Sequence, residues 1–126
     1  MVTLETLNEW LIASSENENL EFKEAKQKFK SDDLMRYAVA IANEGGGYLV
    51  LGITDKKPRY VIGSKAFIDE LDMSATKARV VEKLNIRLNV TELNHLDGRV
   101  LVFEIPSRLS INIQKLTPNQ LPIVST

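Results

Sequence analysis

Residues 43–55 read Asn-Glu-Gly-Gly-Gly-Tyr-Leu-Val-Leu-Gly-Ile-Thr-Asp, and this stretch decides the fold. Its three consecutive glycines end a preceding helix, because glycine readily adopts the left-handed conformation found at helix ends. The apolar run at 48–53 has the length of a strand and predicts a central strand buried on both faces. Phosphate-binding loops run in the opposite order, from strand through glycines to helix, so a nucleotide site here is not expected.

Two elements are predicted upstream of the glycines. Ser31 or Asp32 is suited to cap a helix whose apolar residues recur at helical spacing through 34–42. Before it, Leu20-Glu-Phe-Lys23 alternates apolar and polar residues, which predicts a half-buried strand with Glu21 and Lys23 on one face. A first helix is expected over 4–13, capped by Thr3.

Downstream, residues 64–85 predict a helix in two pieces, broken near 72–74, with Ala78, Val81 and Leu84 on its buried side. Strands at 88–91 and 100–105 flank Asp97-Gly98, a hairpin signal. His95 lies just before it and reads as an exposed turn residue.

The order α-β-α-β-α-β-β predicts a mixed α/β (α+β) fold, a two-layer sandwich with a mixed four-stranded sheet. We expect one domain over residues 1–108 and an extended tail over 109–126. In this order the first two strands, if parallel, would be joined by a right-handed crossover.

The amino-acid composition excludes several kinds of catalytic and metal-binding site. The 126 residues are 44% hydrophobic and 26% charged, as in globular proteins. With no cysteine and one histidine, disulfides, cysteine-ligated zinc, thiol catalysis and a nucleophile–base triad are excluded. No signal peptide or membrane-spanning stretch is evident, which predicts a cytoplasmic protein without a membrane partner.

Two groups of charged residues are candidates for function. Glu16, Glu21 and Asp55 offer the oxygen ligands that Mg²⁺ or Mn²⁺ prefers, with Lys23 beside them. Spacing alone favours an ordinary exposed ion pair at Glu21 and Lys23. The second group is basic, and its alternative interpretation is a solvated loop. It consists of Lys23, Lys26, Lys28, Lys30 and Arg36.

Several spaced motifs together resemble the Schlafen AlbA-type domain over roughly residues 12–108. They are Glu16-(x)4-Glu21-Phe-Lys23, the helix start Asp32-Asp33-Leu34, Ala40-Ile-Ala-Asn43, the stretch 46–55, and the segment 100–108. The resemblance implies an Alba-like fold and a nucleic-acid-binding domain without a cofactor, with DNA favoured over RNA. It also implies a place in a transcriptional regulator or a helicase-related protein.

The same resemblance implies an alternative. A related domain in animal Schlafen proteins cleaves structured RNA with three acidic residues, which correspond here to Glu16, Glu21 and Asp55, with Lys23 adjacent. The chain departs from the family pattern at 56–58 and again at 109–126. A missing last strand would leave a sheet edge open, so a homodimer through that edge or the tail, or a protein-interaction module, is the third interpretation.

Overall fold

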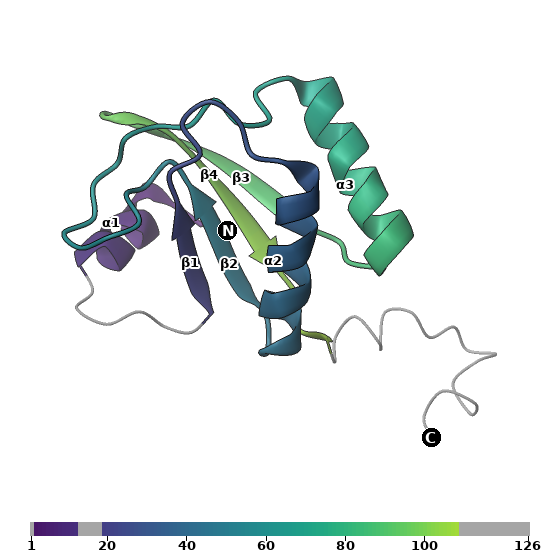
Figure 1. Cartoon of the computed structure of the whole chain (residues 1–126). Helices are drawn as coiled ribbons and strands as arrows, with labels where there is room; N and C mark the ends of the chain where they lie inside the picture. The colour runs from purple at the N-terminus through teal and green to yellow at the C-terminus, as the bar shows by residue number, and fades with distance from the viewer. Residues whose placement is uncertain (1, 13–18, 109–126) are drawn as a thin grey trace.

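The computed structural model describes residues 2–12 and 19–108. Within them the chain forms three helices and four strands in the predicted order (Figure 1). These are α1 (Leu4–Ile12), β1 (Leu20–Lys23), α2 (Ser31–Asn43), β2 (Gly47–Leu51), α3 (Glu70–Leu84), β3 (Asn89–His95) and β4 (Gly98–Ile105). The predicted α+β class is therefore confirmed.

The four strands form one mixed sheet in the order β1-β2-β4-β3. The two strands joined through α2 are parallel, with Phe22 of β1 opposite Val50 of β2. The other two pairs, β2 with β4 and β4 with β3, are antiparallel. This arrangement puts the ends of β1 and β2 side by side, where the chain leaves both strands.

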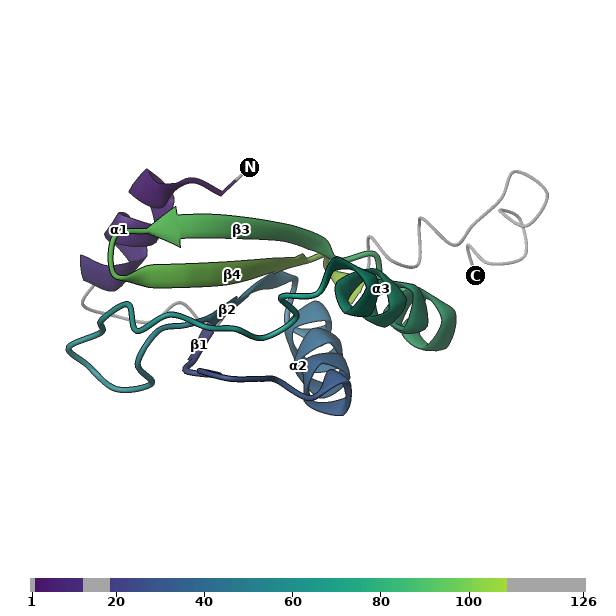
Figure 2. The same ribbon diagram turned by 90° about the horizontal axis from the view of Figure 1, so that it is seen from above.

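Helices cover both faces of the sheet. On one face α2 and α3 pack over an apolar cluster that includes Leu34, Leu49 and Phe103. On the other face α1 inserts Leu7, and the Trp10 ring lies 4.9 Å from the ring of Tyr48. Figure 2 shows α1 and α2 on opposite sides of the strands. The sandwich therefore has a third, shorter layer formed by α1.

Strand β2 is buried on both faces, as predicted. Leu49 and Leu51 contribute to the cluster beneath α2 and α3, and Val50 contributes to the cluster beneath α1. Alternation along a strand sends successive side chains to opposite faces, so an unbroken apolar run fits only a strand with cover on each side.

Helix ends agree with the prediction at some positions and not at others. Thr3 caps α1, its hydroxyl accepting from the Thr6 N–H at 3.2 Å. The predicted cap of α2 is wrong: Lys30 is the N-cap residue, and no side chain caps the helix. Ser31 is already helical, and its Oγ instead accepts from Arg79 of α3 at 2.9 Å. A tertiary contact has replaced the local one.

The helix over 64–85 was predicted in two pieces and is instead one uninterrupted helix that starts later. Asp69 caps α3, its carboxylate accepting from the Leu71 N–H at 2.8 Å. Its fully buried side chains are Thr76 and Val80, while Ala78 is exposed. Residues 64–67 lie before the helix and are held by hydrogen bonds to other segments.

The hairpin is confirmed, and its two-residue loop consists of Leu96 and Asp97, since Gly98 already pairs with His95. His95 is partly buried at the end of β3 rather than an exposed turn residue. Its Nδ1 accepts from the Asp97 N–H at 3.0 Å, which ties the ring to the turn.

Candidate functional site

Glu21 and Lys23 share one face of β1, as the alternating pattern predicts. Leu20 and Phe22 belong to the cluster under α1, so the two charged side chains are on the α2 side of the sheet. There the Lys23 ammonium lies 5.2 Å from the centre of the Tyr37 ring on α2. Lys23 is therefore held against a helix rather than extended into solvent.

Asp55 lies four positions beyond the end of β2, and its charge acts on Lys23. Hydrogen bonding to Tyr37 raises the pKa of Lys23 above its usual value, partial burial opposes that shift, and the negative charges of Asp55 and Glu21 raise the pKa further. Two of the predicted carboxylates thus act on one ammonium group. The parallel pairing of β1 and β2 explains this, because it brings the carboxyl ends of both strands to one edge.

Glu16, the remaining member of the predicted acidic trio, lies outside the described residues. Within residues 2–12 and 19–108, no group of three or more acidic or histidine side chains could hold a metal ion. The metal-binding and catalytic roles of Glu16, Glu21 and Asp55 therefore stay predictions.

The predicted basic group separates into two kinds of residue. Lys26, Lys28 and Lys30 are exposed on the connection of residues 24–30, which we call the lysine loop. In the part of the chain that the structure describes, none of these three forms an ion pair. Arg36, in contrast, pairs with Asp33 one turn earlier on α2, and Lys23 faces Tyr37.

A fourth exposed lysine adjoins the lysine loop. The backbone N–H of Lys65 donates to the Lys26 carbonyl at 2.8 Å, and this bond fixes Lys65 next to Lys26. Like the three lysines of the loop, Lys65 has no ion-pair partner among the described residues. No local sequence signal indicates this neighbour, because it lies almost forty positions along the chain.

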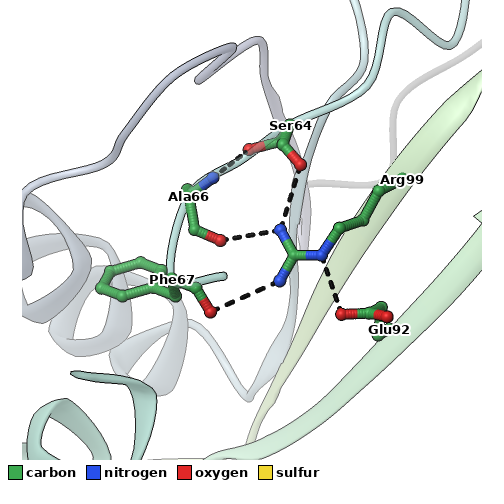
Figure 3. Close-up of polar contacts among 5 residues, drawn as sticks. All are labelled: Ser64, Ala66, Phe67, Glu92 and Arg99. Atoms are coloured by element: carbon green, nitrogen blue, oxygen red, sulfur yellow. Dashed lines mark hydrogen bonds and ion pairs between the residues drawn. The ribbon is translucent and has the colours of Figure 1, made fainter. Parts of the chain in front are cut away.

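Arg99 of β4 holds the segment that carries Lys65 (Figure 3). Its Nη1 donates to the carbonyls of Ser64 and Ala66 at 3.0 and 2.8 Å, and its Nη2 donates to that of Phe67 at 3.4 Å. Its Nε donates to Glu92 at 2.8 Å, and only 15% of the side chain is exposed. Four of the N–H groups of the guanidinium therefore hold structure.

Ser64 attaches the same segment to the lysine loop. Its buried hydroxyl donates to the Ala25 carbonyl at 2.5 Å and accepts from the Ala66 N–H at 3.0 Å. Arg99 and Ser64 were not identified from the sequence. A lone arginine on a strand and a serine in a loop have no distinguishing pattern until the fold brings them together.

A cavity of about 380 Å³ lies between the lysine loop, residues 62–68 and the β3–β4 hairpin. Lys26, Gln27 and Lys65 line it together with the apolar side chains of Ile62 and Ile68. Gly63 and Gly98, also in its wall, meet backbone to backbone. A Cβ added at Gly98 would lie only 2.6 Å from the Gly63 Cα, so this wall has no room for a side chain.

None of the helices in the described part of the chain is both long and apolar enough to cross a membrane.

The family model described as Schlafen, AlbA_2 matches residues 16–120. A search among curated proteins found no significant match. Among solved structures, one similar chain is the N-terminal domain of a protein from Nitrosomonas europaea described as related to the ATP-dependent DNA helicase RecG. The two are 21% identical with a TM-score of 0.61, over 85% of this chain and 74% of that one.

A second similar structure is the DIP2311 protein of Corynebacterium diphtheriae, 19% identical with a TM-score of 0.58. That match covers 82% of this chain and 22% of the other, so this chain corresponds to about a fifth of that protein. At these identities both likenesses establish a shared fold.

Proposed function

Because this chain belongs to the Schlafen, AlbA_2 family, we propose that it is a nucleic-acid-binding domain that contacts the phosphate backbone through the lysine loop and Lys65. DNA is the expected partner. In this proposal the domain works in the cytoplasm within a transcriptional regulator or a helicase-related protein. The solved relative described as RecG-related supports the second of these contexts.

One observation carries the proposal: four exposed lysines, without ion-pair partners in the described residues, lie on two adjoining segments of a chain whose net charge is −1. Since the whole molecule has no excess positive charge, attraction to a polyanion must arise locally. A lysine paired with a carboxylate contributes little to phosphate binding, whereas an unpaired one releases counterions from the nucleic acid.

A salt titration with labelled duplex DNA and structured RNA tests this proposal. We expect binding to DNA to weaken linearly on a log–log plot of affinity against salt concentration. The triple variant Lys26→Ala, Lys28→Ala, Lys30→Ala should bind more weakly and flatten that slope by about 2–3, close to one unit per lost phosphate contact. Binding that is absent at low salt, or indifferent to salt, contradicts the proposal.

The matched control changes three basic residues outside the lysine loop, two in α3 and one just after it. Lys77→Ala, Lys83→Ala, Arg87→Ala alters the net charge by the same amount. It should leave the slope nearly unchanged. Equal losses in both triple variants would mean that overall charge, rather than the lysine loop, determines binding.

A second candidate function is a Mg²⁺- or Mn²⁺-dependent ribonuclease that uses Glu16, Glu21 and Asp55 with Lys23. It is supported by the negative charges of Glu21 and Asp55, both of which raise the pKa of Lys23, and by the parallel pairing of β1 with β2, which brings the ends of these strands together. Lys23 would stabilise the charge that develops on the phosphate. Structured RNA incubated with Mn²⁺ should then be cleaved, and Asp55→Asn should abolish cleavage while binding persists.

A homodimer remains the third proposal. In the described sheet, β1 and β3 are the outer strands, and each has one edge without a strand partner. An open edge is a template for pairing with a second copy. Sedimentation velocity over a range of protein concentrations tests it, and a single monomeric species throughout would exclude the dimer.

A further inference from the structure

The cavity beside Lys26 and Lys65 has a chemistry that backbone binding alone does not require. A phosphate needs cations and N–H donors, yet this cavity also contains Ile62 and Ile68, and Ile68 is 64% exposed. Burying an exposed apolar side chain against an apolar surface of a ligand is favourable. Because two lysines lie beside it, that ligand should also carry a negative charge close to its apolar surface.

We propose that this cavity binds one unpaired nucleotide of a single-stranded or frayed nucleic acid. The phosphate contacts Lys26 and Lys65, and the base enters against Ile62 and Ile68. This inference rests on the proposed function and refines it, because it names the feature of the nucleic acid that the domain selects.

The backbone holds Lys26 and Lys65 next to each other, so that both side chains can contact one phosphate. The bond from the Lys65 N–H to the Lys26 carbonyl sets their backbones side by side. Ser64 and Arg99 fix the rest of the segment, through the Ala25 carbonyl and through three carbonyls of residues 64–67. Since the segment is ordered before the ligand arrives, binding would cost less conformational entropy.

Size and polarity also fit a nucleotide. At about 380 Å³ the cavity falls within the roughly 300–1,000 Å³ of small-molecule sites. Gln27 can both donate to and accept from the edge of a base. Arg99, although it lines the cavity, is committed to Glu92 and to backbone carbonyls, so Lys26 and Lys65 are the cations left for the phosphate.

Unpaired bases are the accessible ones. In a duplex each base is stacked and paired, so its flat face is not available to Ile68, whereas single strands offer every base to apolar side chains. The domain should therefore bind a single-stranded oligonucleotide, or a duplex with an overhang, more tightly than a blunt duplex of the same length.

The test compares three probes at one salt concentration: a ten-nucleotide oligothymidylate, a ten-base-pair blunt duplex, and that duplex with a five-nucleotide overhang. The double variant Gln27→Ala, Ile68→Ala removes two of the three side chains proposed to contact the base and does not change the charge. It should lower affinity for the oligothymidylate and the overhang about tenfold and leave the blunt duplex unaffected. Ile12→Ala is the matched control, an isoleucine that is 82% exposed on α1, and should bind all three probes like the wild type.

Each outcome has a separate meaning. Equal affinity of the wild type for all three probes, or a double variant that retains the preference, overturns the nucleotide pocket but leaves backbone binding intact. If none of the probes binds even at low salt, the proposed function itself fails.

NMR chemical shifts of Gly63 and Gly98 on addition of adenosine monophosphate give an independent readout. If inorganic phosphate causes the same shifts as adenosine monophosphate, the site binds simple anions rather than nucleotides, and the inference is overturned.

Discussion

At the scale of single residues, Arg99 connects β4 to β3 and to the segment before α3. Its five N–H groups lie in a rigid plane, so one side chain can serve three carbonyls of the 64–67 segment and the Glu92 carboxylate at once.

Arg99→Ala should lower the free energy of unfolding by about 2–3 kcal/mol, because it leaves partly buried carbonyls without donors. Arg99→Lys should recover little of this, since an ammonium cannot reproduce the planar fork. Urea denaturation measures both. Arg87→Ala, at an exposed arginine, is the control and should change stability by less than about 0.5 kcal/mol. An equal effect at both arginines would refute the assigned role.

Lys23 provides a pH-dependent prediction at the same scale. Its pKa is raised in the folded state, first by Tyr37 and further by Asp55 and Glu21. Its charged form therefore stabilises the fold below the unfolded pKa of 10.5, and that contribution is lost as the pH rises through the higher folded pKa. Tyr37→Phe should lower the pKa of Lys23. An NMR titration that follows the side-chain carbon next to the ammonium measures this pKa.

The control for Lys23 is a second tyrosine on the opposite face. Burial and the nearby Glu104 raise the pKa of Tyr48, which packs against α1. Tyr48→Phe should leave the Lys23 titration unchanged. A Lys23 pKa that is indifferent to Tyr37→Phe would mean that the carboxylates alone shift it.

At the scale of elements, the end of α2 shows how glycine shapes a junction. The Gly46 N–H donates to the Ile41 carbonyl at 2.9 Å, and the Gly45 N–H donates to the Ala42 carbonyl at 3.3 Å. Both glycines have positive φ, +103° and +86° for Gly45 and Gly46. This is the two-bond helix ending that the glycine run predicts.

The two glycines differ in the space around them, which allows a matched comparison. A Cβ on Gly46 would lie 2.8 Å from the Ile105 carbonyl oxygen, whereas a Cβ on Gly45 would meet nothing within 4 Å. Gly45→Ala should cost about 1 kcal/mol from backbone strain alone. Gly46→Ala should cost at least about 2 kcal/mol more, because β4 cannot move aside easily. Thermal denaturation of the two variants measures the difference in stability. Equal losses of stability would show that β4 moves aside to accommodate the Cβ.

At the scale of the whole molecule, stability is concentrated in the middle of the sheet. Strands β2 and β4 lie at its centre and carry side chains into both apolar clusters. Strands β1 and β3 lie at the edges. We expect amide hydrogen exchange to be slowest in the β2–β4 ladder, where opening requires global unfolding, and faster along β1 and β3. Equally slow exchange along β1 would indicate that its outer edge is covered in solution.

Local chemistry by itself determined several features of this protein. Glycine conformation ended α2, the apolar run 48–53 required a doubly covered strand, and alternation at 20–23 set Glu21 and Lys23 on one face. Each depends on neighbours within one or two turns, so the sequence predicts it. The same holds for the family, since its motifs are local patterns in a fixed order.

The tertiary structure decided what distant residues do together. In the fold, Ser31 bonds to Arg79 instead of capping its helix. Ser64 and Arg99 hold residues 64–67 in place. Lys65 lies beside Lys26. These contacts depend on which loops meet when the sheet closes. The physical reason is that hydrogen bonds between segments compete with local ones, and only the complete fold determines which of them forms.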